Sequence, residues 1–385
     1  TVLIEMGEVA NIPQLRFPEF SNEWEESKVG KVFKVSAGGD IKTENVSQIK
    51  TDGFPYPIYA NAEKAKGLYG YSNLYKSEAN VVTVAGRGVN IGIAHVRLEP
   101  FYPIVRLLVL NPIKDADVKF WENQLNQLNL FVESTGVPQL TAPQISSYKV
   151  KYPSKPEQQK IAAFLTAVDN KIEQLSKKQE LLGEYKKGLM QQIFSQAIRF
   201  KADDGSDFPD WEEKRLGSVG QIVTGKTPST NNPELWDGDI SFITPTDITE
   251  QGKYQTKTQR TITKQRNTKL LPIGSIAYTC IASIGKMMIT TNNSSTNQQI
   301  NSIIVNDDFN NEFVYYALLK LTPYIKSTQA NTTLPIINKT EFSGFKIQIP
   351  SLQEQTKIAI FLSSIDRKIE QVGKQLDESK QFKKA

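Results

Sequence analysis

The chain has 385 residues, of which 39% are hydrophobic and 23% are charged, and its formal net charge is +5. This length predicts at least two domains, and the apolar runs are too short for a membrane-spanning helix. Cys280 is the single cysteine and His95 the single histidine, which excludes an internal disulfide and a cysteine-based zinc cluster and argues against a Ser-His-Asp triad. We therefore expect a protein of the cytoplasm without a metal site, with His95 as a packed or surface residue.

The first part of the chain, 13–152, has the pattern of a mixed α and β domain. Two β-branched runs, 81–86 and 91–98, flank a glycine-rich turn and are typical of paired strands. Ile104–Leu110 is a third apolar run of strand-like character. The stretch 118–134 predicts a helix.

The next segment, 153–200, predicts one long helix. Pro153 and Ser154 are typical of a helix start, and a helix from about 157 to 197 would be roughly 60 Å long. Its apolar residues follow the 4-3 spacing of a coiled-coil seam. The predicted seam consists of Ile161, Leu165, Val168, Ile172, Leu175, Leu182 and Leu189. An amphipathic helix that lies on its own domain is the alternative interpretation.

The same order of elements follows in the second half. The segment 201–349 predicts a second mixed domain, with a strand, turn and strand in 274–290 and a short helix in 312–327 that Pro323 breaks. The segment 350–385 predicts a second long helix. Its seam consists of Ile358, Leu362, Ile365, Ile369 and Val372, followed by Leu376. Because each helix has one apolar stripe, the two helices can bury their stripes against each other.

The two halves are copies of one unit. The stretch PSKPEQQKIAAFLTAVDNKIEQLSK (153–177) recurs as PSLQEQTKIAIFLSSIDRKIEQVGK (350–374), with 15 of 25 residues identical at an offset of 197. The starts also correspond, since FPEFSNEWEESKVG (17–30) resembles FPDWEEKRLG (208–217). The interiors of the two halves diverge strongly. Similar frames with different interiors indicate two platforms that read different targets.

One short stretch matches a nucleotide-binding loop. In GQIVTGKTPST (220–230), the spacing of two glycines, Lys226 and Thr227 fits the phosphate-loop pattern G-x-x-x-x-G-K-[ST]. Such a loop requires a helix that starts at the Lys-Thr pair, whereas Pro228 and the polar sequence after it do not predict one. We interpret the match as chance. We find no other motif of a methyltransferase, nuclease or cofactor site, so the sequence predicts no catalytic residue.

The remaining distinctive sequence is a set of loops rich in Lys, Arg, Asn, Gln, Thr and Ser. Such side chains bind phosphates and base edges, with Arg or Lys suited to guanine and Asn or Gln to adenine. For any single residue, a solvated loop without a ligand is the alternative. The predicted DNA-binding residues are Lys42, Asn61, Lys64, Lys66, Arg87, Asn90, Lys226, Thr227, Ser229, Thr230, Asn231, Lys253, Tyr254, Arg260, Arg266, Lys286, Asn292 and Asn293.

Several stretches together resemble the specificity subunit of type I restriction-modification systems. They are WEEKRLG (211–217), GKTPS (225–229), WDGDISFITPTD (236–247), IGK (284–286), NQQI (297–300) and the repeated segments at 153–177 and 350–374. The resemblance covers about 13–385, and both copies carry it. It implies a mixed α/β fold with two similar target-recognition domains, 13–152 and 201–349, and two long helices, 153–200 and 350–385, packed antiparallel as a coiled coil with approximate two-fold symmetry.

The resemblance also implies a function. Each globular domain would read one half of a bipartite site in double-stranded DNA, and the helices would set the spacing and dock two methyltransferase (modification) subunits. Catalysis would belong to partners: modification subunits that use S-adenosylmethionine, and restriction/translocase subunits that use ATP and Mg. The chain itself would be non-catalytic, would bind no cofactor and would not associate with a membrane.

The sequence departs from this pattern at the second helix, where Ala385 aligns with Gly188 and no counterpart of Leu189–Phe200 follows. Two other functions compete with DNA recognition. A coiled-coil scaffold without direct DNA readout is the alternative, and a stand-alone methyltransferase or nuclease is disfavoured because its catalytic motifs are missing.

Overall fold

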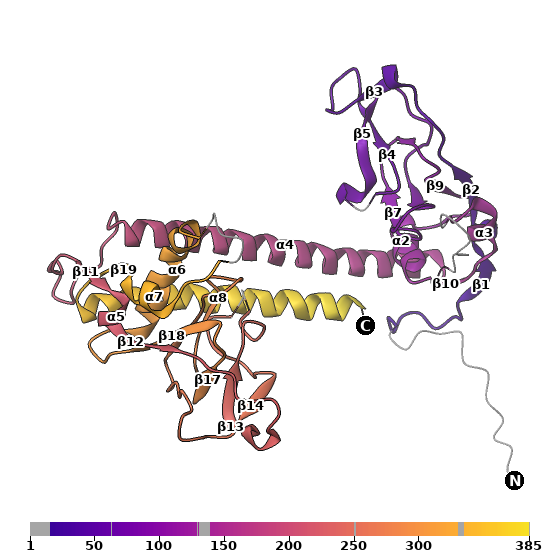
Figure 1. Ribbon diagram of the computed structural model, residues 1–385. Coiled ribbons are helices and arrows are strands. Elements are labelled where there is room, and N and C mark those ends of the chain that lie inside the picture. The colour runs from indigo at the N-terminus through magenta and orange to yellow at the C-terminus, as the bar shows by residue number, and fades with distance from the viewer. Residues whose placement is uncertain are drawn as a thin grey trace, which may run out of the picture. The chain divides into compact units, whose positions relative to one another are not determined.

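The structure is a computed structural model that describes residues 16–62, 64–128, 130, 139–249, 252–329 and 335–384, without the side chain of Lys64 (Figure 1). The chain divides into two compact units, Thr1–Lys171 and Ile172–Ala385. None of the helices found among the described residues combines the length and the apolar character that crossing a bilayer requires.

The first unit is built around a four-stranded antiparallel sheet with the strand order β2-β9-β6-β7. Its strands are β2 (Phe33–Ala37), β6 (Val81–Val84), β7 (Ala94–Arg97) and β9 (Leu108–Pro112). The helices of this unit that precede the long helix are α1 (Val29–Val32), α2 (Val118–Asn126) and α3 (Ala142–Ser147). α2 begins where the Asp117 side chain accepts hydrogen bonds from the N–H groups of Lys119 and Phe120. The buried Phe120 and Trp121 pack into the same core as residues of the sheet.

A second, smaller sheet extends the first unit, with the order β3-β5-β4-β8. Its strands are β3 (Val46–Ser47), β4 (Tyr56–Tyr59), β5 (Leu68–Ser72) and β8 (Tyr102–Pro103), and two short 3₁₀ segments, η1 (Thr43–Asn45) and η2 (Lys64–Gly67), lie between them in sequence. A two-stranded ribbon of β1 (Glu25–Lys28) and β10 (Lys149–Tyr152) leads to the long helix α4 (Lys155–Phe194).

The strand pair predicted in 81–98 is confirmed by β6 and β7. The run Ile104–Leu110 is not a single strand, because β9 begins only at Leu108. Val105 and Arg106 adopt left-handed backbone conformations, with φ of 53° and 58°, and this turn interrupts the strand. α2 ends at Asn126, earlier than the predicted helix, and most of the remainder of that prediction lies outside the described residues.

The second unit repeats this plan. A four-stranded sheet has the order β12-β18-β15-β16, a three-stranded sheet has the order β14-β13-β17, and the ribbon β11-β19 leads to the last helix. The strands are β11 (Glu212–Arg215), β12 (Gly220–Thr224), β13 (Trp236–Ile243), β14 (Arg260–Ile262), β15 (Ile276–Thr279), β16 (Met287–Ile289), β17 (Ser294–Thr296), β18 (Ile300–Val305) and β19 (Lys346–Ile349). The helical segments are α5 (Leu216–Val219), η3 (Pro233–Leu235), α6 (Asn311–Ser327), α7 (Lys339–Gly344) and α8 (Leu352–Lys384). The internal repeat read from the sequence is therefore also a repeat of topology.

α6 corrects the prediction that Pro323 breaks the helix, because the helix continues through it to Ser327. A proline in a helix interior costs about 3 kcal/mol. Burial on both sides of the proline offsets this cost, since Leu318 before it and Ile325 after it are fully buried. The Thr322 hydroxyl also donates a hydrogen bond to the Leu318 carbonyl at 2.8 Å.

The start of α4 is held by a buried ion pair. Glu157 is 1% exposed, and its carboxylate accepts two hydrogen bonds of 2.7 Å from Nε and Nη2 of Arg16. The Trp24 indole N–H donates to the same carboxylate at 3.3 Å. A buried carboxylate is tolerated when it is paired and hydrogen-bonded in this way. We call these three residues the first clasp, because they join the segment before β1 to the helix that follows the domain.

The second unit contains the same arrangement at the start of α8. Glu354 is 0% exposed and accepts hydrogen bonds from Arg199 Nε at 3.2 Å and Nη2 at 2.7 Å. The Trp211 indole donates to Glu354 at 3.2 Å. These residues form the second clasp. The glutamates of the repeated 25-residue segments therefore hold the globular domain to its helix.

The next residue of each repeated segment has an equally local role. Gln158 accepts a hydrogen bond from the Asp117 N–H at 3.0 Å and donates to the Pro153 carbonyl at 2.9 Å. Gln355 repeats both bonds, with the Asn310 N–H and the Pro350 carbonyl, each at 2.9 Å. Each glutamine thus ties the beginning of its long helix to the start of α2 or α6.

Within the second unit, α4 and α8 pack against each other in antiparallel directions. Leu175 packs with Val372 and Leu376 in one buried cluster. Further along α4, Lys186 forms an ion pair of 2.5 Å with Asp366. The partner numbers on α8 fall as those on α4 rise, which defines the antiparallel order (Figure 1).

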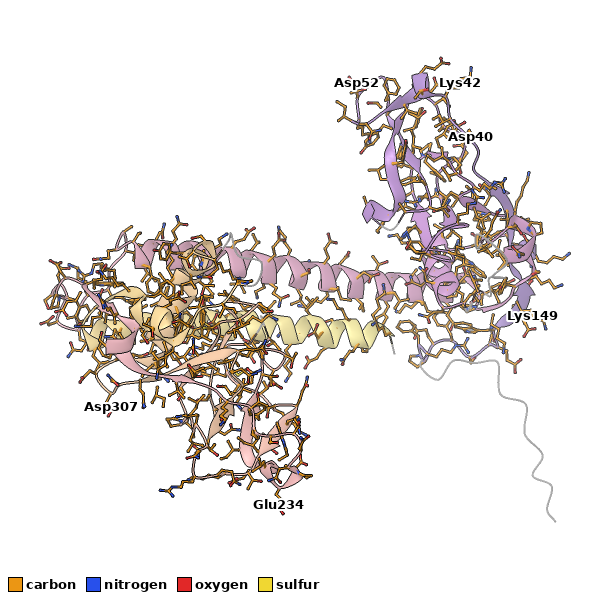
Figure 2. The ribbon with its side chains drawn as sticks, in the orientation of Figure 1. Asp40, Lys42, Asp52, Lys149, Glu234 and Asp307 are labelled. Carbon is orange, nitrogen blue, oxygen red and sulfur yellow. The ribbon has the colours of Figure 1, made fainter. Side chains whose placement is uncertain are left out.

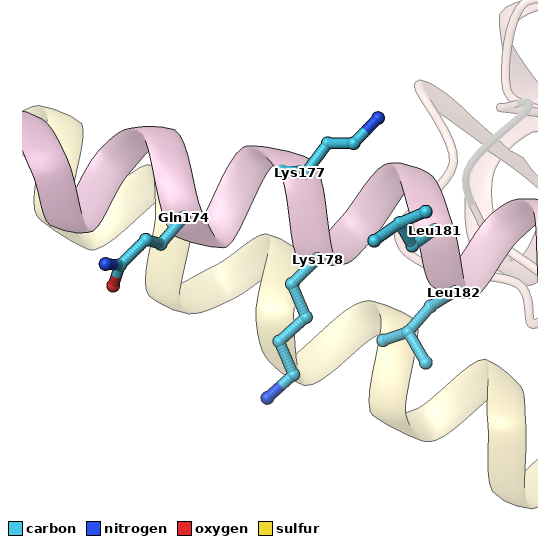
Figure 3. Close-up of a pocket in the computed structure, with 5 residues that line it drawn as sticks. All are labelled: Gln174, Lys177, Lys178, Leu181 and Leu182. Carbon is cyan, nitrogen blue, oxygen red and sulfur yellow. The ribbon is translucent and has the colours of Figure 1, made fainter.

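The residues of the predicted seam that lie in the second unit all take part in its hydrophobic packing. All of them belong to the buried clusters or pack against them: Ile172, Leu175, Leu182, Leu189, Ile358, Leu362, Ile365, Ile369 and Val372. Ile358 and Leu362 also share a core with the sheet of their own domain, as the alternative interpretation expected. Ile161, Leu165 and Val168 belong to the first unit, where Ile161 packs against the core. A shallow groove on α4 is lined by Gln174, Lys177, Lys178, Leu181 and Leu182 (Figure 3).

Candidate nucleic-acid interface

Two turns lie side by side at the end of the first sheet where β2 stops. Turn 86–91 joins β6 to β7, and turn 104–107 joins β8 to β9. The Gly38 N–H donates to the Leu107 carbonyl at 2.8 Å, and the Arg106 N–H donates to the Gly38 carbonyl at 3.1 Å. On the other side, the Leu140 N–H donates to the Gly86 carbonyl at 2.9 Å. Both turns are therefore bonded to neighbouring backbone of the unit, at Gly38 and at Leu140.

Asn61 connects the two turns. Its side-chain amide donates to the Val105 carbonyl at 2.5 Å, and its side-chain oxygen accepts from the Gly86 N–H at 2.9 Å. The sequence placed Asn61 among the DNA-binding residues. In the structure both polar atoms of its side chain bind backbone groups of the chain itself, one in each turn.

Arg97 holds the backbone at Lys66, one of the predicted DNA-binding residues. Its guanidinium is almost fully buried, donates to the Thr83 hydroxyl at 2.9 Å and to the Lys66 carbonyl at 2.7 Å, and lies 3.5 Å from the ring centroid of Tyr59. Burial lowers the pKa of Arg97 from its ordinary value. Because the Lys66 backbone is held in this way, its exposed side chain starts from a fixed position.

The other predicted residues of the first unit have different placements. Arg87 and Asn90 are half-buried in turn 86–91, whose Gly86 N–H donates to Asn61. Lys42 lies at the end of the unit opposite Lys149 (Figure 2) and is 3.6 Å from Glu44. The side chain of Lys64 lies outside the described residues.

In the second unit, loop 225–231 is packed against β17 and the turn after it. The Lys226 N–H donates to the Thr296 carbonyl at 2.9 Å, and the Thr227 hydroxyl donates to Gln298 at 2.7 Å. A Cβ on Gly225 would lie 2.2 Å from the Thr296 carbonyl oxygen. No helix starts at Lys226 or Thr227; the next element in the described chain is η3. The segment therefore lacks the helix N-terminus that a phosphate loop requires.

Trp236 joins this loop to a basic residue of the neighbouring strand. Its indole N–H donates to the Ser229 carbonyl at 3.1 Å, and the guanidinium of Arg260 lies 3.3 Å from the centroid of its ring. A cation over an aromatic face is attracted to it. The structure thus brings the predicted residues Ser229 and Arg260 together around one tryptophan. The side chains of Lys226, Ser229, Thr230, Asn231 and Arg260 are exposed.

Lys253 has a different environment from the one the sequence suggested. Its side chain is 7% exposed, and the amine donates to Ser363 at 2.8 Å and to Glu312 and Tyr316 at 3.2 Å. The Tyr254 hydroxyl also donates to Glu312. These bonds fix the segment 253–254 to α6 and α8 and enclose the amine of Lys253 within the unit.

Burial and neighbouring groups shift the pKa values in this cluster. Burial lowers the pKa of Lys253, although Glu312 partly opposes the shift. Burial alone would raise the pKa of Glu312, but hydrogen bonds from Ser363 and Tyr254 and the nearby Lys253 lower it below its ordinary value. The carboxylate and the ammonium group therefore stabilise each other at neutral pH.

The remaining predicted residues are spread over three loops. Arg266, Asn292 and Asn293 are exposed, and Lys286 is half-buried beside β15, where its N–H donates to the Thr279 hydroxyl at 3.0 Å. Asn293 lies next to β17, and its carbonyl accepts from the Ser241 N–H at 3.3 Å. Within the described ranges, no three His, Cys, Asp or Glu side chains are grouped so that they could hold a metal ion.

The sequence missed Arg106, which is exposed on turn 104–107. The equivalent positions in the second unit are 297–300, since the Gly225 N–H donates to the Ile300 carbonyl as Gly38 does to Leu107, but Gln298 and Gln299 there are not left-handed. The sequence signal for this turn is the NQQI motif of the second unit, whose two glutamines occupy the positions equivalent to Val105 and Arg106. Because the run Ile104–Leu110 has strand-like composition, the turn inside it was not expected.

Comparisons with known proteins agree with the fold and the repeat. A family model described as the type I restriction modification DNA specificity domain matches residues 21–182 and again 209–378. The MjaIX specificity subunit of Methanocaldococcus jannaschii, a type I restriction enzyme subunit, is 35% identical over 190 residues, which cover 47% of this chain and 44% of the relative. The HindI specificity subunit of Haemophilus influenzae is 28% identical over 308 residues, which cover 60% of this chain and 67% of the relative.

A solved structure shares the whole fold. The crystal structure of the S subunit of a type I restriction-modification system from M. genitalium superposes with a TM-score of 0.64 at 17% identity, covering 97% of this chain and 96% of that one. The family model matches both copies of the repeat and most of the chain. This chain belongs to the family defined by the type I restriction modification DNA specificity domain.

Proposed function

We propose that this chain is the sequence-specific DNA-recognition subunit of a type I restriction-modification complex. Each globular domain, 13–152 and 201–349, reads one half of a bipartite site in double-stranded DNA. The long helices, 153–200 and 350–385, set the distance between the half-sites and dock two methyltransferase subunits. The chain carries no catalytic site of its own.

The observation that carries this proposal is that the two units share backbone hydrogen bonds at their turns but differ in the residues of those turns. The hydrogen bond from Leu140 to Gly86 recurs as one from Ile337 to Cys280, each 2.9 Å long. At the turns that this frame presents, the first unit has Arg87 where the second has Ile281. Two equivalent platforms with different side chains at their turns are suited to reading two different base sequences.

The reactions belong to partner subunits in this proposal. Methyl transfer requires S-adenosylmethionine in the modification subunits, and ATP and Mg serve the restriction and translocase subunits. The relatives named above are specificity subunits of type I restriction enzymes, which supports this division of labour. We expect the complex to act in the cytoplasm.

Replacing one globular domain tests the proposal. Exchange of 201–349 for the corresponding domain of another family member should change one half of the methylated site and leave the other half unchanged. The measurement is sequencing of methylated sites in cells that express the exchanged chain with the modification subunits. The reciprocal exchange of 13–152 is the matched control and should change only the other half. An unchanged site in both exchanges would favour a scaffold without DNA readout.

A further inference from the structure

Turn 104–107 keeps a conformation that its residues do not favour. Val105 and Arg106 both have left-handed φ values, and β-branched residues such as valine rarely adopt them. Val105 is nevertheless 48% exposed, so burial of its side chain does not explain the conformation. Backbone strain of this kind persists only where the surroundings impose it, and it is often found at functional sites.

The surroundings do impose it here. The Val105 and Arg106 N–H groups donate to the carbonyls of Gly39 and Gly38, both at 3.1 Å. Gly38 is enclosed by this turn, because a Cβ there would lie 2.7 Å from the Pro103 carbonyl. These hydrogen bonds therefore fix the backbone at Arg106 and the direction in which its side chain starts.

Turn 86–91 is built against it. A Cβ on Gly86 would lie 2.9 Å from the Arg106 carbonyl oxygen, so the two turns are in direct contact. Asn61 bonds to both of them. At the tip of turn 86–91, Gly88 has a φ of 80° and Val89 is fully exposed.

Each turn carries an arginine that has no ion-pair partner among the described residues. No carboxylate among the described residues lies within ion-pair distance of Arg87 or Arg106. Arg87 Nε is buried and has no hydrogen-bond partner within the described part of the chain. An arginine fork suits the O6 and N7 acceptors of guanine, and an apolar side chain such as Val89 suits the methyl group of thymine.

We propose that Arg87 and Arg106 are specificity-determining residues for the half-site read by the first unit, and that Asn61 is the positioning residue that fixes the two turns to each other. This inference rests on the proposed function. At the equivalent positions the second unit carries Gln298 and Gln299, in a turn that is bonded through Gly225 and Ile300 but has no left-handed residue. Arginine and glutamine favour different bases, guanine and adenine.

The test uses the full chain assembled with its modification subunits. Equilibrium binding is measured on a duplex with the complete site and on duplexes that each have one base pair changed. Arg106→Gln should lower discrimination roughly 5- to 150-fold at one base pair of the first half-site and leave the second half-site unaffected. Equal weakening on every duplex would identify a phosphate contact and overturn the role, as would unchanged binding.

Asn61→Ala tests the positioning role. It should lower discrimination at both base pairs that Arg87→Ala and Arg106→Gln affect singly, with the salt dependence of binding unchanged. An effect at only one of these base pairs, or at neither, would overturn the role of Asn61. Normal discrimination in the second half-site of the same complex reports that the variant is folded and docked.

The control is Lys28→Ala. Lys28 is exposed and lies opposite Lys149 in the β1–β10 ribbon, outside both turns, so its loss removes a positive charge without changing the turns. It should leave discrimination unchanged. A parent complex without any base preference would contradict the proposed function itself. A parent complex that discriminates, together with an inert Arg106→Gln, would contradict only this inference.

Discussion

At the scale of single residues, the two clasps contain the most deeply buried carboxylates of the described chain. Each places a glutamate that is at most 1% exposed next to an arginine and a tryptophan. The arginines are less buried than the glutamates, with exposed side-chain fractions of 10% for Arg16 and 23% for Arg199. The two partners of a clasp should therefore respond differently to mutation.

Removing Arg199 should destabilise the second unit more than neutralising Glu354. Arg199→Met leaves a fully buried carboxylate with little compensation, which costs about 3–5 kcal/mol. Glu354→Gln leaves an arginine that can still reach water, and the loss is about 1.5–3 kcal/mol, the range for a hydrogen bond to a charged group. Urea unfolding at neutral pH measures both. Glu370→Gln, on the exposed face of α8, is the control and should change the free energy of unfolding by less than about 0.5 kcal/mol.

The sequence predicts some of the functional residues described above and not others, and each outcome has a physical reason. Arg87 was found because it stands in a glycine-rich turn. Arg106 was missed because its neighbours are apolar, and only the folded backbone shows the left-handed turn. Glu157 is one of the residues that the two repeated segments share, but its partner Arg16 is 141 positions away, a distance over which sequence spacing carries no geometric information.

At the scale of elements, the long helices were predictable and the shorter ones less so. A 4-3 apolar pattern continued over many turns identifies a helix and its buried stripe, and α4 and α8 both follow it. α6 contradicted the local rule about proline because Leu318 and Ile325 are buried in the domain core. Tertiary packing decides such cases, and a single sequence does not reveal it.

Two glycines provide an element-scale prediction. Gly188 lies in α4 with no atom within 4 Å of an added Cβ, so Gly188→Ala should stabilise the chain by about 0.5–1 kcal/mol through helix propensity. Gly225→Ala should destabilise it, because the new Cβ would lie 2.2 Å from the Thr296 carbonyl oxygen. The urea midpoints of both variants measure the difference. A destabilised Gly188→Ala would mean that this part of α4 has a neighbour that the structure does not contain.

At the scale of the whole molecule, the chain is one design used twice. The duplication was evident from the repeated segments, and the structure adds that the four-stranded sheet, the ribbon and the clasp recur, while the second sheet has four strands in the first unit and three in the second. The base sequence that each copy reads does not follow from this frame. It depends on a few side chains at the turns, whose interactions involve a second molecule.

The helical spacer gives a prediction at this scale. An insertion of four residues after Gln179 adds roughly 6 Å of helix and is close to one full turn, so the apolar stripe is nearly kept. The recognised site should keep both half-sequences and gain about two base pairs between them, at roughly 3.4 Å each. Sequencing of methylated sites in cells checks this. An active complex with an unchanged spacer would show that the helices do not set the distance.

The likeness of the two clasps has a consequence for how the chain reaches its native form. Arg16 has the chemistry to pair with Glu354, and Arg199 with Glu157, because each glutamate binds one arginine and one tryptophan. Repeated domains are prone to such exchange of partners. Synthesis from the N-terminus separates the two pairings in time, since Glu157 leaves the ribosome before Arg199 has been made. The order of translation therefore gives Arg16 a single available partner, and the first copy can close before the second exists.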